Sequence, residues 1–219
     1  MRRQIQMNNN KNLSSQIYDE IKKRIVNLSF PPESILYERD LVEMLGVSRT
    51  PIREASIKLI QENWLTTSDR RSLKVKEISA KTVKEIFQFR EMMESFALRY
   101  AFESQTKRVL AGKLDMAVNA MVGTTNDPLE FIKADLAYHT IMIENISNEL
   151  ILNTWLSSCD EITRIAIFSM DKRRRAEDII SEHKYIIEAL WSGELELVLT
   201  TLKKHHNNIL HGCERCFEN

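Results

Sequence analysis

Four ionisable side chains lie at positions where the helical pattern in the second half of the chain predicts apolar residues. Within the segment 127–145, two of them are four residues apart and therefore share one helical face. One histidine interrupts the apolar stripe of the segment 174–192, and another interrupts that of the segment 194–212. The four are Asp135, His139, His183 and, in the last segment, either His205 or His206.

A single histidine in an apolar stripe is usually a core residue bonded to a backbone carbonyl. Four such positions on three helices suggest a shared purpose, because an unpaired buried carboxylate is costly and a cation offsets that cost. Three imidazoles and one carboxylate inside a helical bundle suit Zn²⁺ or another divalent transition metal. Periodicity alone leaves His205 and His206 open as the last ligand, because each continues an apolar stripe.

A second set of residues, near the N-terminus, has the chemistry of DNA contacts. Arg49 and Arg53 are four residues apart, and a guanidinium can bond to O6 and N7 of guanine. Ser48 is the expected cap of their helix, whose positive N-terminal dipole would favour phosphate. Gly46 suits the preceding turn, since a helix exit usually requires positive φ. Arg39, on the helix before that turn, could reach a phosphate or a base.

The elements that hold these residues are mostly helical, because 219 residues contain only 5 Gly and 4 Pro. The N-terminal part is expected to have a helix from Ser14 or Ser15 to the stop at Pro31-Pro32, helices over 38–45 and 48–62, and a hairpin over 64–75. The pattern of apolar residues after Ser79 predicts six helices, at about 79–103, 106–122, 127–145, 149–170, 174–192 and 194–212. The basic run 172–175 supplies one of the breaks between them.

Charge and composition narrow the class of protein. Residues 1–76 carry 14 Lys and Arg against 9 Asp and Glu, whereas the rest of the chain is net acidic. The N-terminal part is therefore expected to bind a polyanion. No apolar run approaches the ~20 residues that span a bilayer, so no membrane contact is expected. Three cysteines make no disulfide framework, which favours a cytoplasmic protein. Cys213 and Cys216 form a lone C-x-x-C, a weak signal for zinc or redox chemistry.

The run LYERDLVEMLGVSRTPIREASIKLIQENWL resembles the DNA-binding domain of GntR-family bacterial regulators over roughly residues 13–76. The resemblance implies a winged helix-turn-helix in which Arg39, Arg49 and Arg53 contact DNA and Thr50 is a neighbouring contact. Arg70, in the expected wing, would enter the minor groove, although the chain has Ser72 where the family usually has glycine after arginine. The implied partner is palindromic double-stranded operator DNA bound by a homodimer, as a repressor would bind it.

The pieces FREMMESFALRYA, DLAYHTIMIENISNELI and EHKYIIEALWSGELELVLTTLKKHH resemble the FCD sensor domain of the FadR-type branch. The resemblance implies an all-α domain over 79–215 that binds a divalent metal, zinc first and nickel or manganese as alternatives. Aligned on Gly193, it selects His205 to complete the set with Asp135, His139 and His183. It also implies a small organic acid as effector, with Arg90 facing it, although a surface salt bridge to Glu94 explains Arg90 equally well.

The expected fold is therefore mainly α: a disordered arm over 1–12, a winged helix-turn-helix over 13–76, and a C-terminal bundle. The expected function is transcription regulation by an effector bound at or near a metal. Two rivals remain at this stage. In one, the metal ion is itself the effector; in the other, the chain is a metal-dependent hydrolase. An enzyme is disfavoured because no general base or glycine-rich loop accompanies the ligands.

Overall fold

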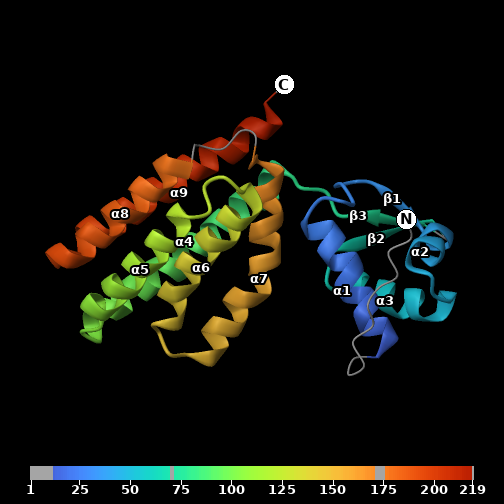
Figure 1. The fold of residues 1–219 in the computed structure, drawn as a ribbon, viewed down its shortest axis with the longest axis horizontal. Helices are drawn as coiled ribbons and strands as arrows, with labels where there is room; N and C mark the ends of the chain where they lie inside the picture. The colour runs from blue at the N-terminus through green and yellow to red at the C-terminus, as the bar shows by residue number, and fades with distance from the viewer. Residues whose placement is uncertain (1–11, 70–71, 171–175, 219) are drawn as a thin grey trace. The chain divides into compact units, whose positions relative to one another are not determined.

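The computed structural model describes residues 12–69, 72–170 and 176–218. The chain divides into two compact units, residues 1–78 and 79–219 (Figure 1). The first contains three helices and a small antiparallel sheet among its described residues, and the second is all helical. The expected fold class, a winged helix-turn-helix followed by a helical bundle, is confirmed.

The N-terminal unit is built from α1 (Leu13–Val26), β1 (Ile35–Tyr37), α2 (Glu38–Leu45), α3 (Arg49–Gln61), β2 (Leu65–Asp69) and β3 (Ser72–Val75). The sheet has the order β1-β3-β2, with Leu36 opposite Leu73 and Leu65 opposite Val75. The sequence predicted the β2–β3 hairpin but missed β1. Three residues are too few for alternation to identify a strand, and β1 exists only because β3 pairs with it.

Two predictions about α1 were wrong. The cap is Asn12, whose Oδ1 accepts a hydrogen bond from the backbone of Ser15 at 2.8 Å, rather than Ser14 or Ser15. The helix ends at Val26, well before the Pro31-Pro32 pair, and Leu28 follows with φ of +59°. A residue in the left-handed conformation ends a helix as effectively as proline does. Leucine rarely adopts this conformation, so the sequence did not predict the helix end at this position.

The helix-turn-helix is formed by α2 and α3. Gly46 ends α2 with φ of +69°, and its N–H bonds to the carbonyl of Val42 at 3.0 Å. Ser48 occupies the N-cap position of α3 as predicted, but its side chain makes no capping hydrogen bond. Packing fixes the pair, since Ile52 and Leu59 of α3 are fully buried and α1 lies against this helix.

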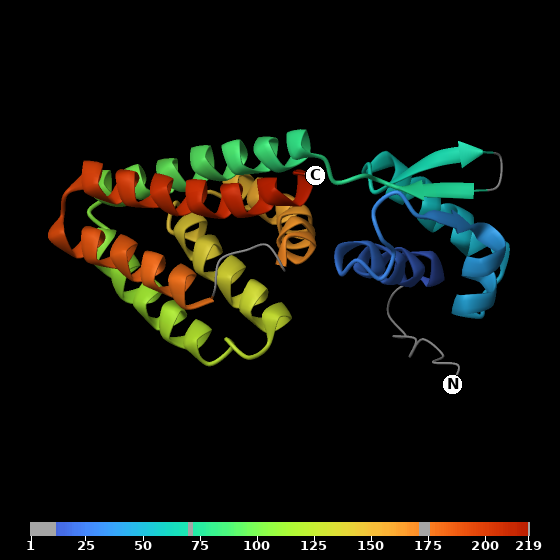
Figure 2. The same cartoon turned by 90° about the horizontal axis from the view of Figure 1, so that it is seen from above.

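The C-terminal unit consists of α4 (Ala80–Glu103), α5 (Lys107–Val122), α6 (Pro128–Glu144), α7 (Glu149–Phe168), α8 (Ala176–Ser192), α9 (Leu195–Glu214) and a final 3-10 turn (Arg215–Phe217). These bounds lie within two residues of the predicted ones at each described end. Helix α4 packs against α9, α9 against α8, and α5 against both α6 and α8 (Figure 2). No helix of the described residues has the length and apolar character to cross a membrane.

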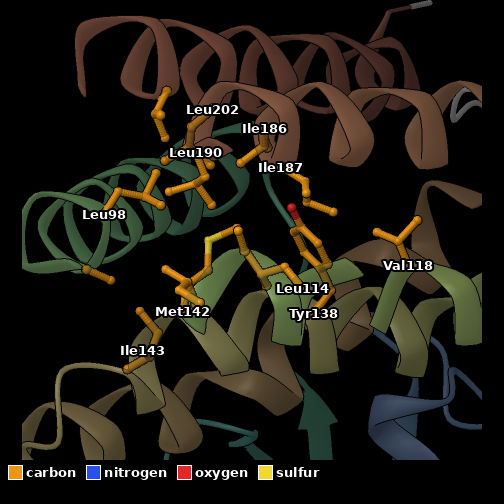
Figure 3. Packing of buried hydrophobic residues seen from close by; sticks show 14 of the residues in the cluster. Leu98, Leu114, Val118, Tyr138, Met142, Ile143, Ile186, Ile187, Leu190 and Leu202 are labelled. Atoms are coloured by element: carbon orange, nitrogen blue, oxygen red, sulfur yellow. The ribbon is translucent and has the colours of Figure 1, made fainter. Parts of the chain in front are cut away.

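Side chains from α4, α5, α6, α8 and α9 form one apolar core (Figure 3). Tyr138 places a polar hydroxyl group in this core. Its fully buried ring extends from α6 toward Ile186 and Ile187 of α8. Its hydroxyl donates a hydrogen bond to the carbonyl of His183 at 3.3 Å. Burial raises the pKa of this phenol well above its usual range, so the hydroxyl remains a donor. The bond ties α6 to α8 beside the candidate site.

Two glycines in open space provide a test of this account. A methyl group added at Gly46 or at Gly112 meets no atom within 4 Å, so only backbone conformation distinguishes them. Gly46→Ala should cost about 1–2 kcal/mol because alanine disfavours positive φ. Gly112→Ala, within α5, should stabilise by about 0.5–1 kcal/mol. Thermal or denaturant unfolding of both variants checks the signs, and two shifts of the same sign would contradict the argument.

Candidate DNA-contacting surface and metal centre

Three of the predicted DNA-contacting arginines lie together on the N-terminal unit. Arg39 of α2 and Arg49 and Arg53 of α3 line one surface hollow with Tyr37 and Glu38. The arginine side chains are largely exposed, at 82% for Arg39 and 61% for Arg53. Three guanidinium groups around one hollow at the start of the second helix of a helix-turn-helix make a surface suited to phosphates and guanine edges.

The acidic neighbours hold two of these side chains in place. Arg53 Nε lies 3.2 and 3.3 Å from the two carboxylate oxygens of Glu38, and Arg39 Nε lies 3.1 Å from Asp40 Oδ1. Exposed ion pairs of this kind are weak, so DNA can compete for the arginines. Ser48 and Thr50 are exposed beside them. Arg70, predicted to contact the minor groove, lies outside the described residues.

The four predicted metal ligands converge inside the C-terminal unit. His139 Nε2 lies 3.3 Å from His183 Nε2 and 3.4 Å from His205 Nε2. Asp135 Oδ1 lies 3.6 Å from His183 Nε2 and 4.0 Å from His139 Nε2. The three imidazoles are fully buried, and Asp135 is 6% exposed. Residues from α6, α8 and α9, distant in sequence, thus bring three imidazole nitrogens together, and the carboxylate of Asp135 lies beside two of them.

Two buried carboxylates orient the imidazoles. His139 Nδ1 lies 2.6 Å from Glu94 Oε2, and His205 Nδ1 lies 3.0 Å from Glu182 Oε2. An ionised carboxylate only accepts hydrogen bonds, so each Nδ1 carries the proton and donates it. In the neutral imidazole the lone pair is then on Nε2. Both rings therefore direct an acceptor atom toward the shared centre.

This arrangement requires a cation or a proton. The lone pairs of His139 and His205 face each other at 3.4 Å with no hydrogen atom between them when both rings are neutral. His183, stacked on Tyr138 with ring centroids 4.0 Å apart, adds a third nitrogen to this group, its Nε2. Buried acceptors without donors are unfavourable, and a metal ion would satisfy all of them together. The donor set fits a divalent cation.

Burial keeps the ring nitrogens available for a metal. It lowers the pKa of His183 to about 3, against the opposing effect of Asp135. Burial also lowers the pKa of His205 well below its usual range, and the neighbouring histidines add to the effect. A metal ligand must be unprotonated, so these shifts leave both imidazoles in the binding form at neutral pH.

Glu94 lies at the centre of a second polar group formed with Arg90, His139 and His206. It is fully buried and accepts from Arg90 Nε at 2.9 Å and from His206 Nε2 at 3.1 Å, besides His139. Burial alone would raise the pKa of this carboxyl, but its interactions with His139, Arg90 and His206 outweigh that effect and hold the pKa well below the usual range. The Arg90–Glu94 pair anticipated on the surface is therefore buried.

A cavity of about 20 Å³ adjoins the metal centre. Arg90 and Asp135 form its charged part, and Asp135 also belongs to the ligand group. The remaining lining residues come from α4, α6, α7 and α9; they are Ile86, Phe87, Ile132, Leu136, Ile162, Thr163, Ile165, Ala166, Ile209 and Cys213. Arg90 therefore lines this cavity and also pairs with Glu94, so its predicted role in effector binding stays a prediction.

Sequence analysis missed the roles of Glu94 and Glu182. Both lie on the buried faces of their helices, and this signal was present in the sequence as a charged residue within an apolar stripe. His206 lies outside the group of converging Nε2 atoms, since its own Nε2 bonds to Glu94. Cys213 is buried with its thiol 3.2 Å from Ser169 Oγ, and Cys216 is half-buried.

Two family models match the chain. The model for bacterial regulatory proteins of the gntR family covers residues 13–75, and the model of the FCD domain covers residues 85–208, more than half of the chain. The chain belongs to the GntR family of regulators with an FCD domain. It is therefore a DNA-binding transcription regulator, and the arginine hollow lies in the GntR part while the histidine centre lies in the FCD part.

Individual relatives agree. The chain is 29% identical over 202 residues to an uncharacterized HTH-type transcriptional regulator, YdhC, of Bacillus subtilis, covering 91% of this chain and 88% of that protein. The structure of E. coli McbR/YncC matches with a TM-score of 0.72 at 18% identity, covering 95% of this chain and all of that one. A metal-free FCD domain of the regulator TM0439 matches with a TM-score of 0.53 at 26% identity, covering 64% of this chain and 96% of that one. These proteins are regulators, so the hydrolase interpretation is set aside.

Proposed function

We propose that this GntR-family regulator binds operator DNA as a homodimer under the control of a metal-dependent effector site. Arg39, Arg49 and Arg53, with Ser48, Thr50 and Arg70 beside them, would contact the operator. The helical domain would bind one divalent metal ion through Asp135, His139, His183 and His205. A small organic acid would bind next to the metal, near Arg90. The observation that carries this proposal is the convergence of three Nε2 atoms and one carboxylate oxygen.

The spacing of these atoms supports zinc among the candidate ions. Four ligands about 2.0–2.1 Å from a tetrahedral ion lie about 3.3–3.4 Å from one another. The nitrogen pairs of His139 with His183 and with His205 lie at 3.3 and 3.4 Å, and Asp135 Oδ1 is slightly farther. Nickel and manganese remain alternatives, since an octahedral ion would keep two positions for a ligand.

The adjoining cavity favours an organic effector over a pure metal sensor. A site that responds to the ion alone has no need of a lined space beside it, yet Arg90 and Asp135 face a cavity with mainly apolar walls. Dimerisation is proposed from the geometry of DNA: one helix-turn-helix contacts a few base pairs, and two half-sites related by symmetry give a specific operator.

Replacement of a recognition arginine should reduce specificity. Arg49→Ala or Arg53→Ala is expected to weaken operator binding by about 1–3 kcal/mol, because each would lose a bidentate guanine contact. The measurement is the affinity ratio between an operator selected from random duplexes and a scrambled duplex, at fixed salt.

Lys23→Ala is the matched control, since Lys23 is an exposed cation on α1. Any phosphate contact it makes weakens both duplexes alike, so the ratio should not change. If Arg49→Ala and Arg53→Ala keep the wild-type ratio, α3 does not dock as proposed.

Loss of one ligand should remove the metal. His183→Ala is expected to reduce the metal content from about one ion per chain to almost none, because the remaining groups hold a divalent ion poorly. Elemental analysis after dialysis measures this. Metal should also raise the unfolding temperature of the wild type, since it binds the folded site and barely the unfolded chain. DNA binding by the N-terminal domain should survive the substitution.

Two other histidines of α9 serve as comparisons. His211→Ala should keep the full metal content, because this side chain is 74% exposed and pairs with Glu214. His206→Ala should retain the ion at reduced affinity, because His206 holds Glu94 and not the ion. Equal metal loss in His183→Ala and His211→Ala, or loss in His206→Ala alone, would overturn the ligand assignment.

The buried carboxylates should tune metal affinity without binding the ion. Glu94→Gln is expected to weaken zinc binding about 10- to 100-fold, because a neutral amide orients and polarises His139 less strongly. Glu182→Gln should act in the same direction through His205. Competition with a chromogenic chelator measures the affinity. Glu91→Gln, on the same helix but 43% exposed, should have no effect, and an equal change in all three variants would contradict the proposed role.

A further inference from the structure

The cavity beside the metal centre indicates which acids the regulator selects. Its charged end is formed by Arg90 and Asp135, both under 7% exposed. Arg90 Nε is occupied by Glu94, but its Nη2 is buried with no hydrogen-bond partner among the described residues. A buried guanidinium nitrogen without an acceptor is unfavourable, and a carboxylate is the acceptor that fits it best.

The rest of the wall offers almost nothing to a polar ligand. Eight of the ten remaining lining residues are hydrocarbon or aromatic side chains. The two exceptions already donate their hydrogens elsewhere: Thr163 Oγ1 to the carbonyl of Cys159 at 2.8 Å, and Cys213 Sγ to Ser169 Oγ at 3.2 Å. A hydroxyl group on the body of the ligand would therefore lose its water and find no free donor on these side chains, only the remaining lone pairs of Thr163 Oγ1 and the weak acceptor Cys213 Sγ.

The cavity is also small. A volume of about 20 Å³ holds little more than one water molecule, for which about 10–15 Å³ suffices. Any larger ligand must displace side chains of the wall, among which Ile86 and Leu136 are only partly buried. Each additional atom adds to that displacement, so a short ligand is favoured over a long one.

We propose that the effector is a short-chain carboxylate with an aliphatic body, and that polyhydroxylated sugar acids are excluded by the wall. This inference rests on the proposed function, since it assumes a carboxylate effector at the metal centre. The carboxylate end lies toward the metal and Arg90, and the hydrocarbon end lies against Ile86, Leu136 and Ile162. Selectivity comes from the desolvation of hydroxyl groups that the wall cannot satisfy.

Two acids with one carbon skeleton isolate this effect. 2-Hydroxypentanoate and ribonate share chain length and head group and differ by the hydroxyl groups along the chain. Isothermal titration of both into the zinc-loaded full-length protein should show 2-hydroxypentanoate binding about 10-fold tighter or more, given the cost of burying unpaired hydroxyls. 2-Hydroxypentanamide, which lacks the carboxylate, should bind far more weakly than the acid.

The possible outcomes distinguish a failure of the predicted selectivity from a failure of the proposed carboxylate effector. Ribonate binding as tightly as 2-hydroxypentanoate overturns the inference and leaves a carboxylate effector standing. Equal binding of the amide and the acid would show that the carboxylate group does not bind to the metal and Arg90 as proposed. If neither acid binds, the carboxylate effector of the proposed function fails, and the inference fails with it.

A substitution in the wall gives an independent test. Ile86→Thr should weaken 2-hydroxypentanoate and narrow its advantage over ribonate, because it places a hydroxyl in the apolar wall. Leu136→Thr, from the opposite helix, should do the same and serves if the first variant is unstable. Val109→Thr, at an exposed position on α5, is the control and should leave both affinities unchanged. An unchanged ratio in folded Ile86→Thr and Leu136→Thr would show that the acid does not lie against this wall.

Discussion

Glu94 places a carboxylate in the interior of the helical unit, beyond the reach of water. The desolvation of an ion there costs several kcal/mol, and the cost is offset only when every lone pair of the ion is used. Arg90, His139 and His206 each donate to it, and they come from α4, α6 and α9. These three helices must therefore adopt one relative arrangement, since a shift in any of them would leave a buried charge without a partner.

The same group determines what the histidine centre can do. Glu94 accepts a hydrogen bond from Nδ1 of His139, and Glu182 accepts one from Nδ1 of His205, so the Nε2 lone pairs of both rings face inward. Burial then disfavours the imidazolium form, as the lowered pKa values of His183 and His205 indicate. Neutral nitrogens held with their lone pairs facing one another are poorly stabilised by protein alone. A cation bound among these nitrogens would stabilise the polar interior.

The sequence predicted those parts of the molecule that local rules determine. The helix-turn-helix depends on Gly46 and on a dense local pattern, and the proposed ligands Asp135 and His139 lie four residues apart on one helix. The three arginines around the surface hollow were identified in the same way, two of them one helical turn apart. The missed features are non-local. Strand β1 exists through its pairing with β3, and the roles of Glu94 and Glu182 depend on histidines 45 and 23 residues away.

The adjacent pair His205-His206 shows what sequence periodicity cannot predict. Both positions continue an apolar stripe of α9 and both are buried, so periodicity cannot rank them. Consecutive residues on a helix point about 100° apart, and the neighbouring helices decide what each one meets. Glu182 of α8 and Glu94 of α4 lie on the two sides of α9, and each accepts a hydrogen bond from one histidine. His205 is bonded through Nδ1, which leaves its Nε2 for the centre, whereas His206 is bonded through Nε2 itself. In the proposed site, His205 is therefore the ligand because its carboxylate partner binds Nδ1, whereas the partner of His206 binds Nε2.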